Sequence, residues 1–184
     1  IITNLIKDNQ LSELVMHIIQ SNVNKFTIWP AAVSVHHNIK GGLLLHTRNV
    51  ALIAHRIAVN YSDIDMDLVL SGAILHDIGK IEIPIEIINK PSKLTKEEFD
   101  IVKIHAPLGG DYVMDNKCIS NDIYMGIISH HEKYNGTGYP HSLKSNDIPL
   151  FGRIIAVADV YDALTGNRPY RDPIKPLEAI EYIM

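Results

Sequence analysis

The chain has 184 residues, a length that is typical of a single domain. Apolar residues make up 46% of it and charged residues 21%, which excludes an intrinsically disordered chain. Seventeen lysines and arginines against 21 aspartates and glutamates give a net charge of −4, so we expect no broad nucleic-acid-binding face. The ten histidines are the unusual feature of this composition.

The expected location follows from compartment signals. No apolar run reaches the roughly 18 residues that a membrane span needs, and we find no signal peptide. The single cysteine, Cys118, cannot form a disulfide within the chain, which is typical of a reducing compartment. We therefore expect a cytoplasmic protein. Because the first residue is Ile1 rather than Met, we also expect the chain to be part of a longer protein.

Helical spacing of apolar residues dominates the sequence, and strand signals are poor. Residues 1–40 are expected to form a helical segment and a loop that pack on a core of residues 41–184, all within one compact domain. After Gly41-Gly42, a helix is predicted from Leu43 to about Asn60. Asp67 is predicted to cap the next helix, which Gly79 would stop.

The second half of the chain continues this pattern. Thr95 and Glu98 form a capping box, and the helix that they open is expected to bend near Pro107. Three later helices are predicted: one capped by Asn121 or Asp122 and ending near His130-His131, one over Phe151–Leu164, and one after Pro176. The sequence thus predicts an all-α, single-domain helical bundle.

Histidines or aspartates lie at or near the ends of five of these segments, and a closed bundle would bring them to a common interior. Imidazole and carboxylate groups suit first-row metals such as iron, manganese, zinc or cobalt, and the thiolates of a structural zinc site are missing. A carboxylate such as that of Asp77 can bridge two metal ions about 3.5–4 Å apart, an arrangement used in phosphate-ester chemistry. The candidate ligands are His46, His76, Asp77, His105, His130, His131 and Asp159.

The sequence around these residues resembles the HD phosphohydrolase superfamily. The segment His76-Asp77-Ile78-Gly79-Lys80 resembles the motif that defines that superfamily. His130-His131-Glu132, followed by the Gly-Tyr-Pro loop of residues 135–140, looks like the signature of its HD-GYP subfamily. Residues 157–165 and 168–171 resemble the segment that follows in that subfamily. The resemblance extends from about residue 41 to residue 171.

This resemblance implies an HD-type helical bundle with a metal centre in its interior. It implies a bacterial signalling enzyme that hydrolyses cyclic di-GMP to pGpG, with GMP as a further product, through a hydroxide held between two metals. Iron or manganese is expected, with zinc, nickel and cobalt as alternatives, and a third ion is not expected. By the same resemblance, one metal is held by His46, His76, Asp77 and Asp159, and the second by Asp77, His105, His130 and His131, with Asp77 as the bridge.

The resemblance also implies contacts to substrate and partners. Lys80 matches a lysine that contacts the scissile phosphate, while Arg168 and Arg171 lie where the family places phosphate-binding cations. Gly138-Tyr139-Pro140 matches a surface that binds diguanylate cyclase domains of the GGDEF type, and sensor or receiver domains are often fused in this family. Whether Glu132 supports the site or lies on the surface stays open.

Two features depart from the family pattern and leave alternatives. Some members hold a third metal with a glutamate four residues before the first ligand, where this chain has Gly42, although Asp162 matches another contributor or could support a ligand from behind. The segment before His46 looks closer to other HD enzymes, including 3′–5′ exoribonucleases, so that His36 or His37 could supply a ligand. The alternatives are hydrolysis of another cyclic dinucleotide, a nucleotide or an RNA 3′ end, or binding of a cyclic dinucleotide or a cyclase without hydrolysis.

Overall fold

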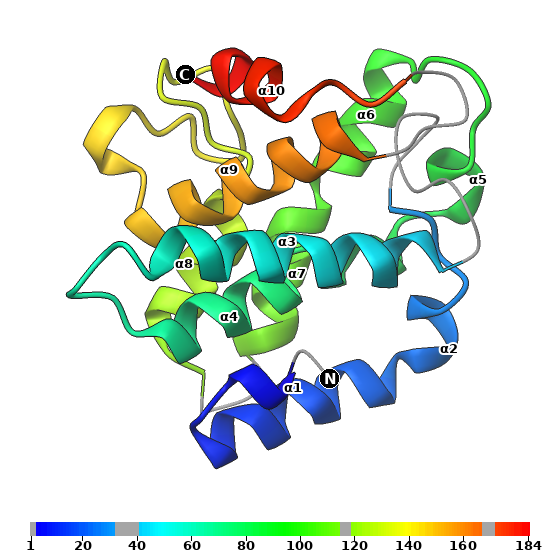
Figure 1. Ribbon diagram of the computed structural model, residues 1–184. Helices are drawn as coiled ribbons and strands as arrows, with labels where there is room; N and C mark the ends of the chain where they lie inside the picture. Colours follow the sequence, from blue (N-terminus) through cyan, green and yellow to red (C-terminus); the bar gives the residue numbers. More distant parts are fainter. Residues whose placement is uncertain (1–2, 32–40, 115–118, 167–171) are drawn as a thin grey trace.

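The computed structural model describes residues 3–31, 41–114, 119–166 and 172–184 (Figure 1). Every regular secondary-structure element within these ranges is a helix, which confirms the predicted all-α class. No helix among them is long and apolar enough to cross a membrane. The central bundle is formed by α3 (Gly42–Ala58), α4 (Met66–Leu75), α7 (His105–Met114), α8 (Asn121–Ser129) and α9 (Leu150–Thr165).

Shorter elements surround this bundle. Figure 1 shows the N-terminal helix α1 and the C-terminal helix α10 on opposite sides of it, where α1 contacts α4 and α10 contacts α9. The 3-10 helix η2 packs against α7. The surrounding elements are η1 (Thr3–Leu5), α1 (Asn9–Ser21), α2 (Val23–Phe26), η2 (Ile78–Glu82), α5 (Ile85–Ile88), α6 (Lys96–Lys103), η3 (Ser145–Asp147) and α10 (Pro176–Ile183).

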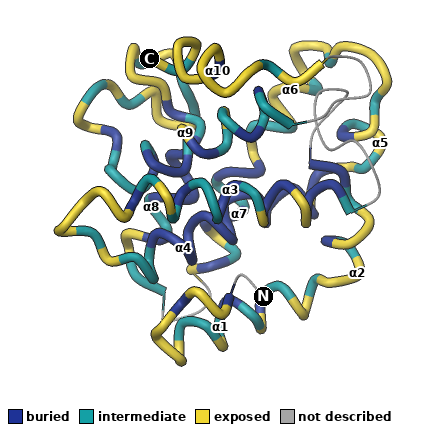
Figure 2. The backbone as a smooth tube through the Cα atoms, viewed as in Figure 1, coloured by how far each residue is buried: buried dark blue, intermediate teal, exposed yellow. Residues whose placement is uncertain are grey.

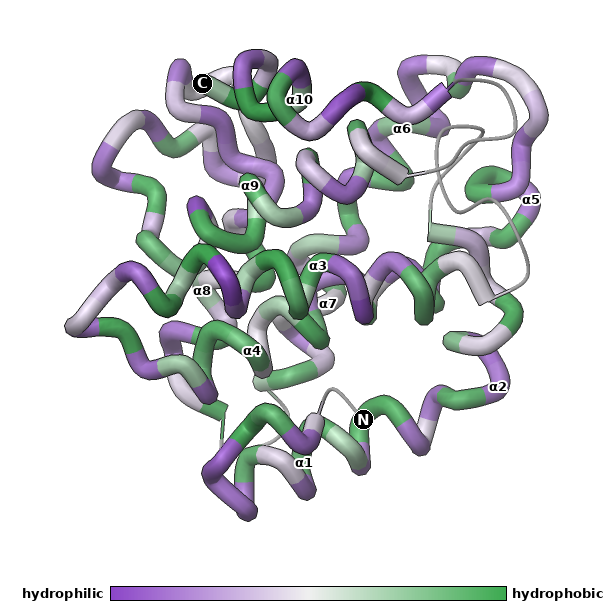
Figure 3. The backbone as a smooth tube through the Cα atoms, viewed as in Figure 1, coloured by the Kyte–Doolittle hydropathy of each residue, from purple (hydrophilic) through white to green (hydrophobic). Residues whose placement is uncertain are grey.

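The core lies where α3, α4, α8 and α9 meet. Val50, Leu70, Ile123 and Ile155 come from these four helices and are fully buried. Helix α4 is buried on all sides from Val69 to Leu75, and Figures 2 and 3 show it as a largely buried and hydrophobic segment. A helix that is apolar on every face belongs in the interior of a bundle. Its C-terminal end therefore delivers the next residues of the chain into the interior.

The start of α4 differs from the prediction. The cap is Asp65 rather than Asp67, because the Asp65 carboxylate accepts a hydrogen bond from the amide of Leu68 at 3.3 Å. The Asp67 carboxylate instead accepts hydrogen bonds from the backbone amides of Lys7 and Asp8, at 3.0 and 2.7 Å. Asp67 thus ties the N-terminal segment to the bundle.

The capping box predicted at Thr95 and Glu98 is present at the start of α6. The bend that follows comes earlier than predicted, because α6 ends at Lys103 and α7 begins at His105. Pro107 is the third residue of α7 rather than the site of the bend. A proline is tolerated in the first turn of a helix, where amide groups have no partner within the helix.

Candidate metal centre

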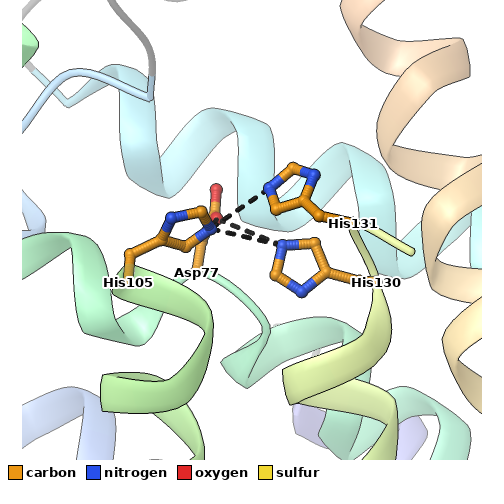
Figure 4. Close-up of side chains that lie close together, drawn as sticks. All are labelled: Asp77, His105, His130 and His131. Carbon is orange, nitrogen blue, oxygen red and sulfur yellow. Dashed lines mark hydrogen bonds and ion pairs between the residues drawn. The ribbon is translucent and has the colours of Figure 1, made fainter. Parts of the chain in front are cut away.

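All seven predicted metal ligands lie together where α3, α4, α7, α8 and α9 meet. They form two groups, and the ligand atoms within each group lie within 4.8 Å of one another. One group consists of Asp77, His105, His130 and His131, and the other of His46, His76 and Asp159. Figure 4 shows the three rings of the first group converging on the carboxylate of Asp77.

Three of the histidines lie at helix ends: His76 and His130 directly follow α4 and α8, and His105 is the first residue of α7. Helix α4 stops ahead of the predicted stop at Gly79, with His76 as its C-cap and His76 Nδ1 2.8 Å from the carbonyl oxygen of Ala73. His105 and His130 repeat this contact with carbonyl oxygens three residues earlier, at 2.6 and 2.5 Å. Because a carbonyl oxygen only accepts, each Nδ1 is the protonated nitrogen and each Nε2 keeps a lone pair for a metal.

Helix α8 delivers His130 to the site. The cap of this helix is Ser120, whose hydroxyl accepts a hydrogen bond from the amide of Ile123 at 3.4 Å. The predicted caps, Asn121 and Asp122, are instead its first two helical residues. The predicted N-cap of α8 is thus wrong by one or two residues. The C-terminal end of the helix, with His130 as its C-cap, is where the sequence predicted it.

Asp77 lies between the two groups, with one carboxylate oxygen toward each. Asp77 Oδ1 is 3.4 Å from His105 Nε2 and 3.9 Å from His130 Nε2. Asp77 Oδ2 is 3.4 Å from His76 Nε2 and 3.5 Å from His46 Nε2. Two donors that share one ion at about 2.1 Å lie roughly 3–3.5 Å apart. These separations suit a carboxylate that bridges two ions.

Buried polar atoms without a hydrogen-bond partner indicate whether the site fits a metal. Asp77 Oδ1 and His76 Nε2 are buried and make no hydrogen bond to any residue that the structure describes. Burying such an atom unsatisfied costs about 1–3 kcal/mol. A divalent cation would satisfy both atoms, and imidazoles with carboxylates suit iron, manganese or zinc. The residues therefore fit a divalent metal centre.

Lys80 keeps Asp77 ionised. Burial alone would raise the pKa of the Asp77 carboxyl, but the charge of Lys80 and the adjacent histidines hold that pKa well below its usual range. Lys80 Nζ lies 2.6 Å from Asp77 Oδ2, and it also donates to the carbonyl oxygen of Ala31 at 2.7 Å. The side chain that was predicted to contact phosphate thus already contacts both the central carboxylate and Ala31 of the N-terminal segment.

Three of the candidate histidine ligands are in the neutral form that binds metals. Burial, with a contribution from the charge of Lys80, lowers the pKa of His105 to about 4. Burial and the neighbouring His76 lower the pKa of His130 to about 3. Burial and the neighbouring His130 hold the pKa of His131 well below its usual range. Near neutral pH these three rings are already neutral, so they can bind a metal without first releasing a proton.

His46 has a different environment. Burial would lower its pKa, but hydrogen bonds to Asp159 and Asp162 outweigh burial and raise the pKa to about 9. His46 Nε2 lies 3.1 Å from Asp159 Oδ1, and Nδ1 lies 2.7 Å from Asp162 Oδ2. Burial would raise the pKa of Asp159, but the bond to His46 holds it well below its usual range. The ring is thus held between two carboxylates, and a cation at Nε2 would displace a proton.

Glu132 anchors the Gly-Tyr-Pro loop. Its buried carboxylate accepts hydrogen bonds from the backbone amides of His141 at 2.6 Å and Leu143 at 3.0 Å. The sequence left the role of Glu132 open, and the fold shows that it supports the loop. Its position directly after His130-His131 is the sequence feature that pointed to a role near the site. Its partners, the backbone amides of His141 and Leu143, could not be predicted from the sequence.

The loop also packs directly on the site. The ring of Tyr139 lies 4.7 Å from that of His131 between centroids, and its backbone amide donates to the carbonyl oxygen of His131 at 3.2 Å. A Cβ atom on Gly138 would collide with the backbone of Lys133 and lie 2.5 Å from Glu132 Cα, so glycine is needed for this close approach. Burial raises the pKa of Tyr139, so its hydroxyl stays protonated.

Several predicted residues lie outside the described part of the chain. These are the proposed phosphate-binding residues Arg168 and Arg171 and the alternative ligands His36 and His37. Their roles stay predictions.

Known proteins share both the sequence and the fold. A family model described as "HD domain" matches residues 14–184. A cyclic di-GMP phosphodiesterase of Thermotoga maritima is 42% identical over 138 residues, which cover 72% of this chain and 37% of that protein. A 3′3′-cGAMP-specific phosphodiesterase 2 of Vibrio cholerae is 40% identical over 131 residues, covering 70% and 25% of the two chains.

Two further matches add to these. The cyclic di-GMP phosphodiesterase response regulator RpfG of Xanthomonas campestris is 37% identical over 72% of this chain and 35% of its own. The solved structure of Bd1817, a HDG"Y"P protein from Bdellovibrio bacteriovorus, matches with a TM-score of 0.63 and 21% identity, over 99% of this chain and 57% of that one. The chain spans 25–37% of the length of these curated relatives.

Proposed function

Because the chain belongs to the HD domain family, and within it to the HD-GYP group, we propose that it is a metal-dependent phosphodiesterase that hydrolyses cyclic di-GMP to pGpG, with GMP as a further product. The observation that carries this proposal is the gathering of seven histidines and aspartates in two groups around the two oxygens of Asp77. The names of the relatives from Thermotoga and Xanthomonas support the substrate.

The two groups of ligand atoms support two metal ions, and the donor chemistry favours iron or manganese. Bound metals would polarise the phosphate and lower the pKa of the attacking water. The proposed ligands of one ion are His46, His76, Asp77 and Asp159, and those of the other are Asp77, His105, His130 and His131.

The protein's own groups have distinct tasks in this reaction. Asp77 stays ionised next to Lys80 and fixes the separation of the two histidine groups. Lys80 has three N–H donors, of which the described residues Asp77 and Ala31 use two, so that a third is proposed to donate to a phosphate oxygen. A positive charge at that place would stabilise the charge that develops on the phosphate. Arg168 and Arg171 are proposed to bind the remaining phosphate oxygens.

The wider setting is proposed from the relatives. A response regulator among them supports a place in bacterial signal transduction and a fused receiver or sensor domain. The loop at Tyr139, which is anchored by Glu132, is the proposed surface for a diguanylate cyclase domain. We propose a cytoplasmic location, where cyclic dinucleotides are made and consumed.

The name of one relative supports 3′3′-cGAMP as an alternative substrate. The Vibrio relative, at 40% identity over 70% of the chain, is named as specific for 3′3′-cGAMP. The two cyclic dinucleotides have the same phosphate ring and differ in one base. The metal centre would serve both, so a comparison of rates must decide between them.

The test uses protein purified without oxygen and loaded with Mn(II) or Fe(II). Cyclic di-GMP and 3′3′-cGAMP are supplied separately, and the products are resolved by chromatography. We expect metal-dependent release of pGpG from cyclic di-GMP and no turnover by Asp77→Ala. Undiminished turnover by Asp77→Ala would contradict the proposed centre. Turnover of 3′3′-cGAMP alone would favour the second substrate, and binding without turnover by metal-loaded protein would favour a sensor.

A further inference from the structure

In the part of the chain that the structure describes, a carboxylate lies behind one histidine of the His46 group, where Asp162 accepts a hydrogen bond from His46 Nδ1. Resting on the proposed metal-dependent function, we propose that Asp162 and Asn49 are positioning residues that fix the ring of His46. They thereby set the affinity for the ion that His46 binds, and leave the ion of the His105 group unaffected.

The contacts form a chain of hydrogen bonds from the surface of α3 to the site. Asn49 Nδ2 donates to Asp162 Oδ1 at 2.9 Å, and Asp162 Oδ2 accepts from His46 Nδ1 at 2.7 Å. Arg48 in turn donates to Asn49 Oδ1 at 3.3 Å. His46 is fully buried and Asp162 is 4% exposed, so the carboxylate acts on the ring with little screening by water.

The partner of Nδ1 distinguishes His46 from His76, His105 and His130. Nδ1 of His76, His105 and His130 donates to a neutral backbone carbonyl. His46 Nδ1 donates to a carboxylate, which makes the ring a stronger electron donor at Nε2 and fixes its orientation more tightly. Of these four rings, only that of His46 has a carboxylate as the partner of Nδ1 among the described residues. The His46 group therefore contains a ring that a charge holds from behind.

Asp162 acts through the ring and not as a ligand of that ion. Asp159 and Asp77 face the Nε2 side of His46, at 3.1 and 3.5 Å, while Asp162 faces the Nδ1 side. The two nitrogens lie on opposite sides of the imidazole ring, so one ion cannot contact both Nε2 and the Asp162 carboxylate. Gly42, one turn before His46, adds no carboxylate on the Nδ1 side.

Two variants and a matched control test the inference. Asp162→Asn keeps the side-chain shape and removes the charge behind His46. Asn49→Ala leaves the carboxylate in place and removes the donor that orients it, together with the exposed contact from Arg48. Asp111→Asn is the control, because it makes the same exchange at an exposed position of α7. Each protein is titrated with Mn(II) in the absence of oxygen, and the bound ions are followed by metal analysis and electron paramagnetic resonance.

We expect the parent protein and the control to bind two Mn(II) ions whose spectrum shows magnetic coupling. In Asp162→Asn, the dissociation constant of one ion should rise by about 10–100-fold while that of the other stays unchanged. At an intermediate Mn(II) concentration, the spectrum of Asp162→Asn should therefore be that of an isolated Mn(II) ion. Asn49→Ala should weaken the same single ion by a smaller factor.

The outcomes separate this inference from the proposed function. Two unchanged affinities in Asp162→Asn, or equal weakening of both ions, would overturn the inference while leaving a two-metal parent protein intact. A parent protein that binds neither Mn(II) nor Fe(II) would contradict the proposed function itself. If Asp162→Asn fails to fold, Asn49→Ala decides alone: weakening of one ion supports the inference, and unchanged affinities overturn it.

Discussion

At the scale of single residues, Lys80 shows how one side chain combines structural and chemical tasks. It is buried, and it donates both to Asp77 and to the carbonyl oxygen of Ala31. Loss of its charge would leave Asp77 without its closest cation. Bound metal ions would supply positive charge to Asp77 in its place, but they would not replace a donor to phosphate.

Lys80→Met is therefore expected to keep its metal ions and to lose turnover. Removing one stabilising donor from a reaction centre lowers kcat by about 100–1,000-fold. Steady-state rates and metal content would be measured on the same metal-loaded sample. A variant with a normal rate would show that Lys80 contacts no phosphate, and one that loses its metals would show that its task is to hold Asp77.

Residue identity was enough to predict that the seven candidate ligands lie together, but it did not predict the groups that contact them. The pairs His76-Asp77 and His130-His131 stand in distinctive local sequences, so they could be recognised without the fold. Asn49 and Asp162 are 113 residues apart, and only the packing of α3 on α9 shows that they are partners. The sequence offered two roles for Asp162, and its hydrogen bond to His46 Nδ1 is the observation behind the proposed supporting role.

At the scale of elements, the backbone contact between η2 and α7 holds the HD motif against His105. A Cβ atom on Gly79 would collide with the carbonyl oxygen of His105 and lie 2.6 Å from the amide nitrogen of Gly109. Neither atom belongs to a side chain that could move away. Glycine at this position thus allows the two elements to approach closely.

Gly79→Ala is expected to lower the free energy of unfolding by about 3 kcal/mol or more, because overpacking against backbone forces the elements apart. Gly72→Ala is the matched control, since a Cβ there would lie 3.2 Å from the flexible end of Ile155 and should cost about 1 kcal/mol or less. Urea unfolding followed by circular dichroism measures both. Similar losses in the two variants would refute the role given to this contact.

The loop at Tyr139 is a second element with a local anchor. Glu132→Ala should free the amides of His141 and Leu143, because both donate to its carboxylate. We expect faster hydrogen exchange at these two amides and unchanged exchange in α4. Glu86→Ala, at an exposed position, serves as control. Unchanged protection in the loop would show that other contacts hold it.

Helix positions were more predictable than helix ends. Apolar spacing located the long helices because their buried faces recur at helical intervals. The caps at Asp65 and Ser120 were missed because neighbouring acidic or amide residues are equally good caps in isolation. At α4 the choice depends on Asp67, which is engaged by backbone amides 59 and 60 residues away.

At the scale of the whole molecule, the candidate ligands join five helices at one place. His46 comes from α3, His105 from α7 and Asp159 from α9, while the other ligands directly follow α4 and α8. An unfolded chain would not hold these donors together. Metal binding should therefore be coupled to the stability of the bundle.

Mn(II) is expected to raise the melting temperature, and a chelator should reverse the change. A ligand at 100 times its Kd that binds only the folded state contributes about 2.7 kcal/mol. Asp77→Ala, which removes the residue shared by both groups, should show little of this shift. Calorimetry with and without Mn(II) measures it, and an equal shift in Asp77→Ala would place the bound ion elsewhere.

The histidines at the helix ends have a consequence for how this chain can change during evolution. His76 and His130 are the C-caps of α4 and α8, and each Nδ1 bonds to the last turn of its helix. A substitution that abolishes metal binding at either position also removes the group that satisfies the end of a core helix. Selection for folding would thus oppose the loss of His76 or His130, even in a descendant in which selection for activity has ceased.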